Sequence, residues 1–190
     1  MPVQLAVGSA HKFHGPKGVG LIYISGDMQI APLMHGGAQE RDMRGGTENV
    51  PGIVGLCKAL EIAYQDLDRT QRYIQHLKDH MINRLQAQLP GVTFNGTSAQ
   101  AQASLYTILS VCLPPSESHD MLVFNLDIRH IAASVGSACA SGSHVGSHVL
   151  AALGSNAQQG TVRFSLSKYN TIEEVDYAAS QLASLYLSTD

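Results

Sequence analysis

Residues 3–24 read VQLAVGSAHKFHGPKGVGLIYI and contain two short apolar runs, at 3–7 and 19–24. A loop rich in glycine and proline separates them and carries several polar side chains. Short apolar runs bounded by Gly and Pro are typical of buried strands. We therefore predict a strand, a polar turn-forming loop and a second strand.

The segment that follows has a helical pattern from about residue 50 to residue 89. Asn49 is placed as its N-cap, with Pro51 inside the first turn, and Pro90-Gly91 ends it. In the second half, apolar residues recur at three- and four-residue spacing, which predicts one apolar helix face. These residues are Ile74, Leu77, Met81, Leu85 and Leu89.

The rest of the chain alternates between predicted strands and helices. Pro114-Pro115 is expected to break one strand, and Thr171 with Glu174 forms a capping box that opens the last helix. The expected elements are strands at 92–94, 105–113 and 162–166 and helices at about 117–127, 145–153 and 171–187. This alternation indicates an α/β or α+β fold.

Composition excludes several classes of protein. The 190 residues include 12 Lys plus Arg and 15 Asp plus Glu, for a formal net charge of −3. No basic stretch supports a nucleic-acid partner, no apolar run approaches the roughly 18 residues of a membrane span, and no secretory signal pattern opens the chain.

Cysteine usage points to a reducing compartment. The three cysteines, Cys57, Cys112 and Cys139, form no CxxC motif and no close metal-ligand spacing. This pattern argues against a disulfide scaffold or a zinc module and fits the cytoplasm. Cys57 and Cys112 lie within helix and strand patterns, so we interpret both as packing residues.

Lys12 is the first candidate for chemistry. Its amine could form a Schiff base if it is deprotonated, and the nearby Ser9 and His11 could bind a phosphate group. The alternative is an inert, solvated loop lysine.

Cys139 is the second candidate. It lies in the segment 134–148, SVGSACASGSHVGSH, which is built almost entirely from small residues. Such a segment supplies no bulk to bury a thiol, and an accessible loop suits a nucleophile that must move. The alternative is a linker cysteine without a role.

Two further residues could hold anionic groups. The run Gly45-Gly46-Thr47 could present backbone N–H groups and a hydroxyl to a phosphate, or it could be an ordinary turn. Arg163 lies within a predicted strand, where its guanidinium could clamp a carboxylate. An edge-strand charge or a structural ion pair would explain Arg163 equally well.

Taken together and in order, four segments resemble the pyridoxal-phosphate-dependent cysteine desulfurases of the class V aminotransferase group. The segments are SAHKFHGPKGVG (9–20), HGGAQERDMRGGTEN (35–49), GSACASG (136–142) and RFSLSKYNTIEEVDYA (163–178). Any one of them alone is a weak signal, but together they extend over nearly the whole chain.

The resemblance implies a cofactor site for pyridoxal 5′-phosphate (PLP). Lys12 would bind the cofactor as a Schiff base and later move protons, while Ser9 and His11 would bind the phosphate. Thr47 would reach the phosphate of the neighbouring subunit's cofactor, which implies a homodimer. No metal site is implied.

The resemblance also implies a reaction. Arg163 would hold the carboxylate of L-cysteine, and Cys139 would attack the substrate sulfur. The products would be L-alanine and a persulfide on Cys139, which a sulfur acceptor such as an iron–sulfur scaffold would receive. A selenocysteine lyase-like enzyme is an alternative with the same fold and the same lysine.

The implied fold is the C-terminal part of a PLP-dependent transferase subunit of fold type I. Residues 1–68 would be a remnant of the large PLP-binding domain, and residues 69–190 the small α+β domain. Family members carry a long portion before the lysine segment, which supplies most of the large-domain sheet. We therefore expect exposed edges and apolar faces at strands 3–7 and 19–24. A truncated, non-catalytic fragment is a further alternative.

Overall fold

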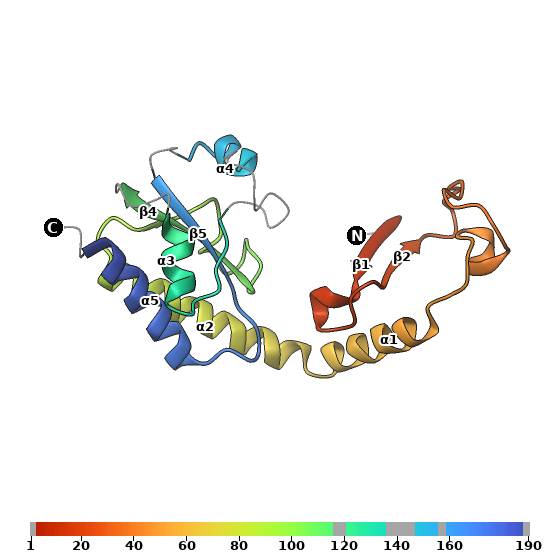
Figure 1. The fold of residues 1–190 in the computed structure, drawn as a ribbon, viewed down its shortest axis with the longest axis horizontal. Helices are drawn as coiled ribbons and strands as arrows, with labels where there is room; N and C mark the ends of the chain where they lie inside the picture. The colour runs from red at the N-terminus through yellow and green to blue at the C-terminus, as the bar shows by residue number, and fades with distance from the viewer. Residues whose placement is uncertain (1–2, 116–120, 136–146, 156–158, 188–190) are drawn as a thin grey trace. The chain divides into compact units, whose positions relative to one another are not determined.

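The computed structural model describes residues 3–115, 121–135, 147–155 and 159–187 (Figure 1). The chain divides into two units, Met1–Leu67 and Asp68–Asp190. Both units contain helices and strands, so the mixed α/β class expected from the sequence is confirmed. No helix within the described residues is long and apolar enough to cross a membrane.

The first unit is built around an antiparallel pair of strands, β1 (Leu5–Ser9) and β2 (Gly20–Ile24). The short 3₁₀ helix η1 (Ala10–Phe13) follows β1 directly. A second 3₁₀ turn, η2 (Gln39–Asp42), precedes helix α1 (Val50–Gln65). Strand β1 lies two residues later than predicted, because its pairing with β2 extends through Ser9 opposite Gly20.

The apolar side chains of this strand pair are exposed, as expected. Val7 is 80% exposed, and Ile22, which lies directly opposite it, is 59% exposed. The sheet contains β1 and β2 only, so the outer edge of each strand is unpaired within the described residues.

The region predicted as one helical stretch is two helices, α1 and α2 (Leu67–Gln88). The predicted N-cap is confirmed, since Gly52 N–H donates to Asn49 Oδ1 at 3.2 Å. The interruption falls at Asp66, whose φ of −125° and ψ of 27° are not helical. Aspartate has a low helix propensity, which weakens the helix at this point.

The second unit contains a three-stranded antiparallel sheet in the order β3–β4–β5. The strands are β3 (Thr93–Phe94), β4 (Ile108–Pro115) and β5 (Gln159–Ser165). The strand predicted to end before Pro114-Pro115 includes both prolines and ends at Pro115, two residues later than predicted. A register shift between Cys112 and Pro115 accommodates them, since proline has no N–H for regular pairing.

Helices α2, α3 (Leu122–Ile128) and α5 (Ile172–Leu187) enclose the core against one face of this sheet (Figure 1). The short helix α4 (His148–Ala152) lies on the other side. The five apolar residues predicted to share one helix face are all buried on α2 or directly after it. The alternating residues Leu109, Val111 and Leu113 of β4 and Val162 and Phe164 of β5 are buried as well. The core includes Leu77, Met81, Leu85, Leu109, Val111, Leu113, Leu126, Val162, Phe164, Val175 and Leu182.

Helix boundaries differ from the prediction in several places. Helix α3 begins at Leu122, although the predicted residues 117–120 lie outside the described residues. The helix expected at 145–153 is limited to the five residues of α4 within the described part of the chain. The capping box of α5 is confirmed, because Glu174 N–H donates to Thr171 Oγ1 and Thr171 N–H donates to Glu174 Oε2.

The two cysteines predicted to pack have different environments. Cys112 is buried in β4, as expected, whereas Cys57 lies exposed on α1, so the prediction for Cys57 is wrong. Helix α1 exposes several of its apolar residues. A cysteine within its apolar pattern therefore need not face the core. Both cysteines are free thiols.

A lysine lies fully buried on the apolar face of α2. Lys78 is 0% exposed, and its Nζ donates to Ser104 Oγ at 2.9 Å and to the carbonyl oxygen of Leu105 at 2.8 Å. Burial lowers the pKa of Lys78 from its ordinary value of 10.5, because desolvation disfavours the charged ammonium. These two bonds fasten the segment before β4 to the helix.

This burial predicts a pH dependence of stability. Between its lowered folded pKa and 10.5, Lys78 binds more protons in the unfolded chain, so the free energy of unfolding rises with pH in that window. Wild-type protein should therefore gain stability relative to a Lys78→Met variant between about pH 7 and about pH 10. Urea unfolding at both pH values measures this gain. Lys58→Met is the control, since Lys58 is exposed. The same change in the free energy of unfolding with pH for wild type and Lys78→Met would contradict the prediction.

Candidate functional site

The turn after β1 carries three of the predicted site residues. Ser9 is the last residue of β1 and the N-cap of η1, and His11 and Lys12 lie within η1 itself. His11 and Lys12 are exposed, and Ser9 is half-buried. A primary amine, an imidazole and a hydroxyl thus share one short turn, where the amine is open to a small molecule.

The turn is anchored on both sides. Ala10 is fully buried, and its N–H donates to the carbonyl oxygen of Val19 at 3.1 Å. Gly15 N–H donates to the carbonyl oxygen of Ala10 at 2.8 Å. A Cβ at Gly15 would lie 2.9 Å from Ala10 Cβ and 3.1 Å from Ala59 Cβ, so only glycine allows the turn to pack this closely on α1. The hydrogen bonds and close packing of Ala10 and Gly15 therefore hold the backbone of the turn that carries Lys12.

Thr47 lies at the end of a closed loop in the same unit. Gly45 N–H donates to the carbonyl oxygen of Met34 at 2.9 Å. A Cβ at Gly45 would approach Gly36 N to 2.7 Å, so the two arms of the loop meet at these glycines. The exposed Thr47 hydroxyl follows this closure directly and precedes the N-cap of α1.

Gln39 is a residue of this loop that the sequence did not reveal as part of the site. Its Oε1 accepts a hydrogen bond from Gly46 N–H at 3.1 Å, next to Thr47. The three residues after Gln39 have positive φ angles, between 47° and 64°, which non-glycine residues rarely adopt. The turn with positive φ angles and the hydrogen bond from Gly46 to Gln39 together fix the position of Thr47 on the loop.

Arg163 lies in the middle of β5, as predicted, in the second unit. It pairs with Ser110 on β4, and on its other side it exchanges backbone hydrogen bonds with Ser134, at 2.7 and 3.1 Å. Its Nε is buried and has no hydrogen-bond partner among the residues that the structure describes. No carboxylate in the described part of the chain forms an ion pair with Arg163.

Arg163 also lines a cavity of about 220 Å³ between the sheet and α4. Ser110, Thr161 and Asn95 contribute polar groups, and side chains of the α4 region contribute apolar ones. Ser155 Oγ donates to Asn95 Oδ1 at 3.1 Å, and Asn95 Nδ2 donates to Ser110 Oγ at 3.0 Å. This chain of hydrogen bonds fastens the end of the α4 segment to the sheet.

The structure thus brings Ser9, His11 and Lys12 together on one turn and places Thr47 on another loop of the same unit. Arg163 belongs to the second unit. Cys139 lies outside the described residues. The hydrogen bond to Gln39 could not be predicted, because a side chain that accepts from a backbone N–H seven residues away leaves no periodic signal in the sequence.

Comparisons with known proteins identify the family to which this chain belongs. The family model described as aminotransferase class-V matches residues 1–178. The cysteine desulfurase IscS of Methanosarcina thermophila is 44% identical over 176 residues, which cover 92% of this chain and 42% of the relative. The cysteine desulfurase IscS of Clostridium botulinum strain Hall is 39% identical over 184 residues, covering 96% of this chain and 46% of the relative.

Solved structures agree with these relatives. A NifS-like protein superposes with a TM-score of 0.82 at 38% identity and covers 97% of this chain and 46% of its own. A NifS-like protein from Rickettsia africae gives a TM-score of 0.83 at 25% identity. The chain belongs to the class-V aminotransferase family. It spans less than half the length of the curated relatives that it matches.

Proposed function

We propose that this chain is the C-terminal part of a PLP-dependent cysteine desulfurase, which converts L-cysteine to L-alanine and retains the sulfur as a persulfide on Cys139. The observation that carries the proposal is the exposed Lys12 on a turn with Ser9 and His11, in a chain similar to proteins named cysteine desulfurases. Residues 1–68 would form the end of the large PLP-binding domain, and residues 69–190 the small domain.

The residues of the η1 turn fit PLP as a cofactor. PLP carries an aldehyde and a phosphate, and the turn offers an amine for the first and a hydroxyl and an imidazole for the second. Lys12 would hold the aldehyde through Nζ, while Ser9 and His11 would bind phosphate oxygens. When bound, PLP withdraws electrons from the carbon atoms of the amino acid, which permits cleavage of its carbon–sulfur bond.

Thr47 supports a homodimeric assembly. In our proposal its exposed hydroxyl binds the phosphate of the cofactor held by the partner subunit, so each site needs two copies of the chain. The hydrogen bond from Gly46 N–H to Gln39 would keep this hydroxyl at a fixed position on the loop.

Arg163 would bind the substrate through its carboxylate. The guanidinium has a buried Nε that lacks a partner among the described residues, and a planar carboxylate is the complement that would satisfy it. Holding the carboxylate fixes the orientation of the amino acid, so its sulfur can be presented to a nucleophile.

Cys139 would accept the sulfur atom. Its thiolate attacks the sulfur of L-cysteine, a sulfur–sulfur bond forms, and the bond between sulfur and Cβ breaks, leaving its electron pair with the carbon skeleton. Lys12 would move the proton that completes L-alanine. The persulfide would then pass to a sulfur-acceptor protein such as an iron–sulfur scaffold. The free thiols of Cys57 and Cys112 are compatible with a cytoplasmic location, which we include in the proposal.

The proposal predicts that Cys139→Ala prevents sulfur transfer but leaves the cofactor bound. The PLP-loaded protein, completed by the half of the fold that this chain does not span, should form L-alanine and reducible sulfur from L-cysteine. The Cys139→Ala variant should lose at least about 100-fold of this activity, because the covalent acceptor is gone. Cys57→Ala is the matched control, and unchanged sulfur transfer by Cys139→Ala would refute the proposal.

A further inference from the structure

The side chain of Asn95 joins strand β4 to the segment that follows helix α4. Asn95 comes directly after β3 and is buried, with 9% of its surface exposed. Its Nδ2 donates to Ser110 Oγ at 3.0 Å, and its Oδ1 accepts from Ser155 Oγ at 3.1 Å. Its backbone N–H also donates to the carbonyl oxygen of Ser110 at 3.0 Å. Because a carboxamide carries both a donor and an acceptor, this one side chain bonds to both segments.

Helix α4 depends on such contacts for its position. It has five residues, and a helix of that length is not stable by itself. Its C-terminal end lies on the turn after β3, where Ser155 bonds to Asn95 and Leu153 contacts Gly96. A Cβ at Gly96 would lie 3.4 Å from Leu153 Cδ1, so the two segments pack closely. We therefore expect removal of the Asn95 carboxamide to loosen α4 from the sheet.

The hydrogen bond from Asn95 to Ser110 ends beside Arg163. Ser110 and Arg163 are directly paired on β4 and β5, so their side chains share one face of the sheet. The neighbouring Val111 and Val162 are buried in the core on the opposite face, since side chains alternate along a strand. Helix α4 supplies apolar side chains to the cavity of about 220 Å³ that Ser110 and Arg163 also line. It therefore forms a wall of the cavity that holds the Arg163 side chain.

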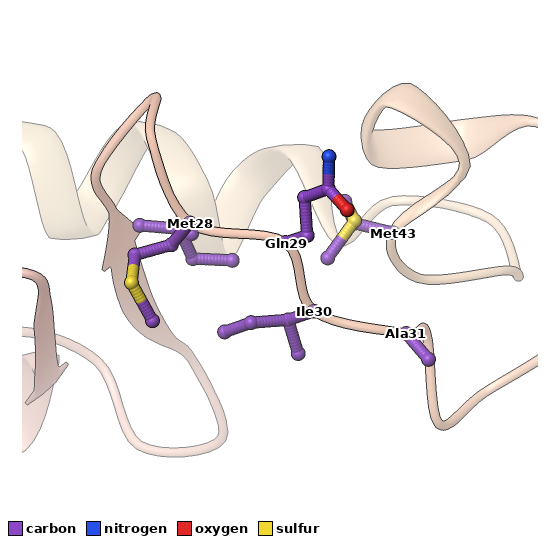
Figure 2. Close-up of a pocket in the computed structure, with 6 residues that line it drawn as sticks. Met28, Gln29, Ile30, Ala31 and Met43 are labelled. Atoms are coloured by element: carbon purple, nitrogen blue, oxygen red, sulfur yellow. The ribbon is translucent and has the colours of Figure 1, made fainter.

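A larger pocket, of about 430 Å³, lies in the first unit and has a different chemistry (Figure 2). It is lined by Ile24, the segment 28–31 and Met43. Gln29 has a polar side chain, and none of these described residues is charged. A carboxylate is bound most strongly by a cationic donor such as a guanidinium. Of these two cavities, the one at Arg163 therefore suits a carboxylate.

We infer that Asn95 is a positioning residue for Arg163. Through Ser110 and α4, it holds the walls that enclose the Arg163 side chain, whose Nε is buried. The guanidinium then keeps one orientation toward a carboxylate, which reduces the entropy that binding would cost. The inference rests on the proposed function, in which Arg163 binds the carboxylate of L-cysteine.

The reaction of the chain with phenylglyoxal, which modifies accessible guanidinium groups, tests this positioning without the cofactor. Peptide mass spectrometry measures the rate of modification at Arg163. Asn95→Ala should raise this rate by about three- to tenfold, the factor that corresponds to the loss of one hydrogen bond. Arg84, which is partly exposed on α2, is the internal reference, and its rate should not change.

Ser155→Ala is a second, milder variant. It removes one hydrogen bond to Asn95 and leaves the carboxamide and its bond to Ser110 in place. It should also raise the rate at Arg163. Because Ser155 acts through Asn95, the double variant should react no faster than Asn95→Ala alone, whereas independent effects would multiply.

Thr97→Ala is the matched control. Thr97 lies in the same turn, and its Oγ1 donates to the carbonyl oxygen of Ala103 at 2.9 Å, so this variant also loses one hydrogen bond. Thr97 is not one of the described residues that line the cavity. Its replacement should leave the rate at Arg163 unchanged.

The same variants are then compared as completed, PLP-loaded protein. Asn95→Ala should raise KM for L-cysteine by about three- to tenfold and change kcat by less than about twofold, because the carboxylate is held equally before and during the reaction. Thr97→Ala should change neither value.

Faster modification of Arg163 in Asn95→Ala, with no desulfurase activity in wild-type protein, would support the positioning role and count against the proposed function alone. Three results would overturn the inference. They are an unchanged rate at Arg163 in both Asn95→Ala and Ser155→Ala, an equal rise in Thr97→Ala, and a lower kcat at constant KM in Asn95→Ala.

Discussion

Replacing Lys12 by alanine is expected to abolish covalent attachment of PLP and to reduce desulfurase activity by about 10²- to 10⁴-fold, the usual range for a lost proton-transfer group. Lys12 is exposed on η1, with Ser9 and His11 on the same turn, so no other group on that turn offers a primary amine. Borohydride treatment of the PLP-loaded protein fixes the cofactor on the reacting lysine. Peptide mass spectrometry should locate it on Lys12.

Lys17→Ala is the matched control for this experiment. Lys17 is also exposed and lies five residues further along the same loop, but outside the anchored turn. Its replacement should leave both the labelled peptide and the activity unchanged. Labelling of Lys17 in wild-type protein, or persistent labelling of the same peptide in Lys12→Ala, would show that the cofactor assignment is wrong.

The largest effect on stability is expected from Leu77→Ala. Leu77 is fully buried on α2 within the core that joins this helix to β4, β5 and α5. Truncating a buried leucine removes its transfer free energy and leaves a cavity, so the free energy of unfolding should fall by about 2–5 kcal/mol.

Urea unfolding of the second unit, followed by circular dichroism, measures this loss. Leu105→Ala is the control, because the Leu105 side chain is mostly exposed and its loss should change the free energy of unfolding by less than about 0.5 kcal/mol. Equal effects of the two substitutions would mean that α2 does not pack as the core cluster indicates.

The sequence was a good guide wherever local chemistry decides the structure. The period of apolar residues identified the buried face of α2, and side-chain caps identified the starts of α1 and α5. These features depend on neighbours three or four residues apart, so they can be predicted without the rest of the fold.

Features that depend on distant partners were not predicted. The prolines at the end of β4 are tolerated because the pairing with β5 shifts register there. Lys78 is buried because Ser104 and Leu105, more than 25 residues away, accept its hydrogen bonds. A charged residue in a helical pattern gives no sign of such partners.

The site shows the same division. Ser9, His11 and Lys12 fall on one turn because they are close in sequence, which made their shared role a natural hypothesis. The position of Thr47 depends on a loop closed by glycine contacts and by Gln39, and only the structure shows that closure.

In the proposed reaction, Cys139 receives sulfur from L-cysteine. The most direct measurement is the mass of the peptide that contains Cys139, after the completed, PLP-loaded protein has reacted with L-cysteine and its thiols have been alkylated without reduction. We expect one additional sulfur atom on Cys139 in stoichiometric amounts, lost on treatment with a reductant and absent from the peptides that carry Cys57 and Cys112. An unmodified Cys139 alongside continued formation of L-alanine would contradict it.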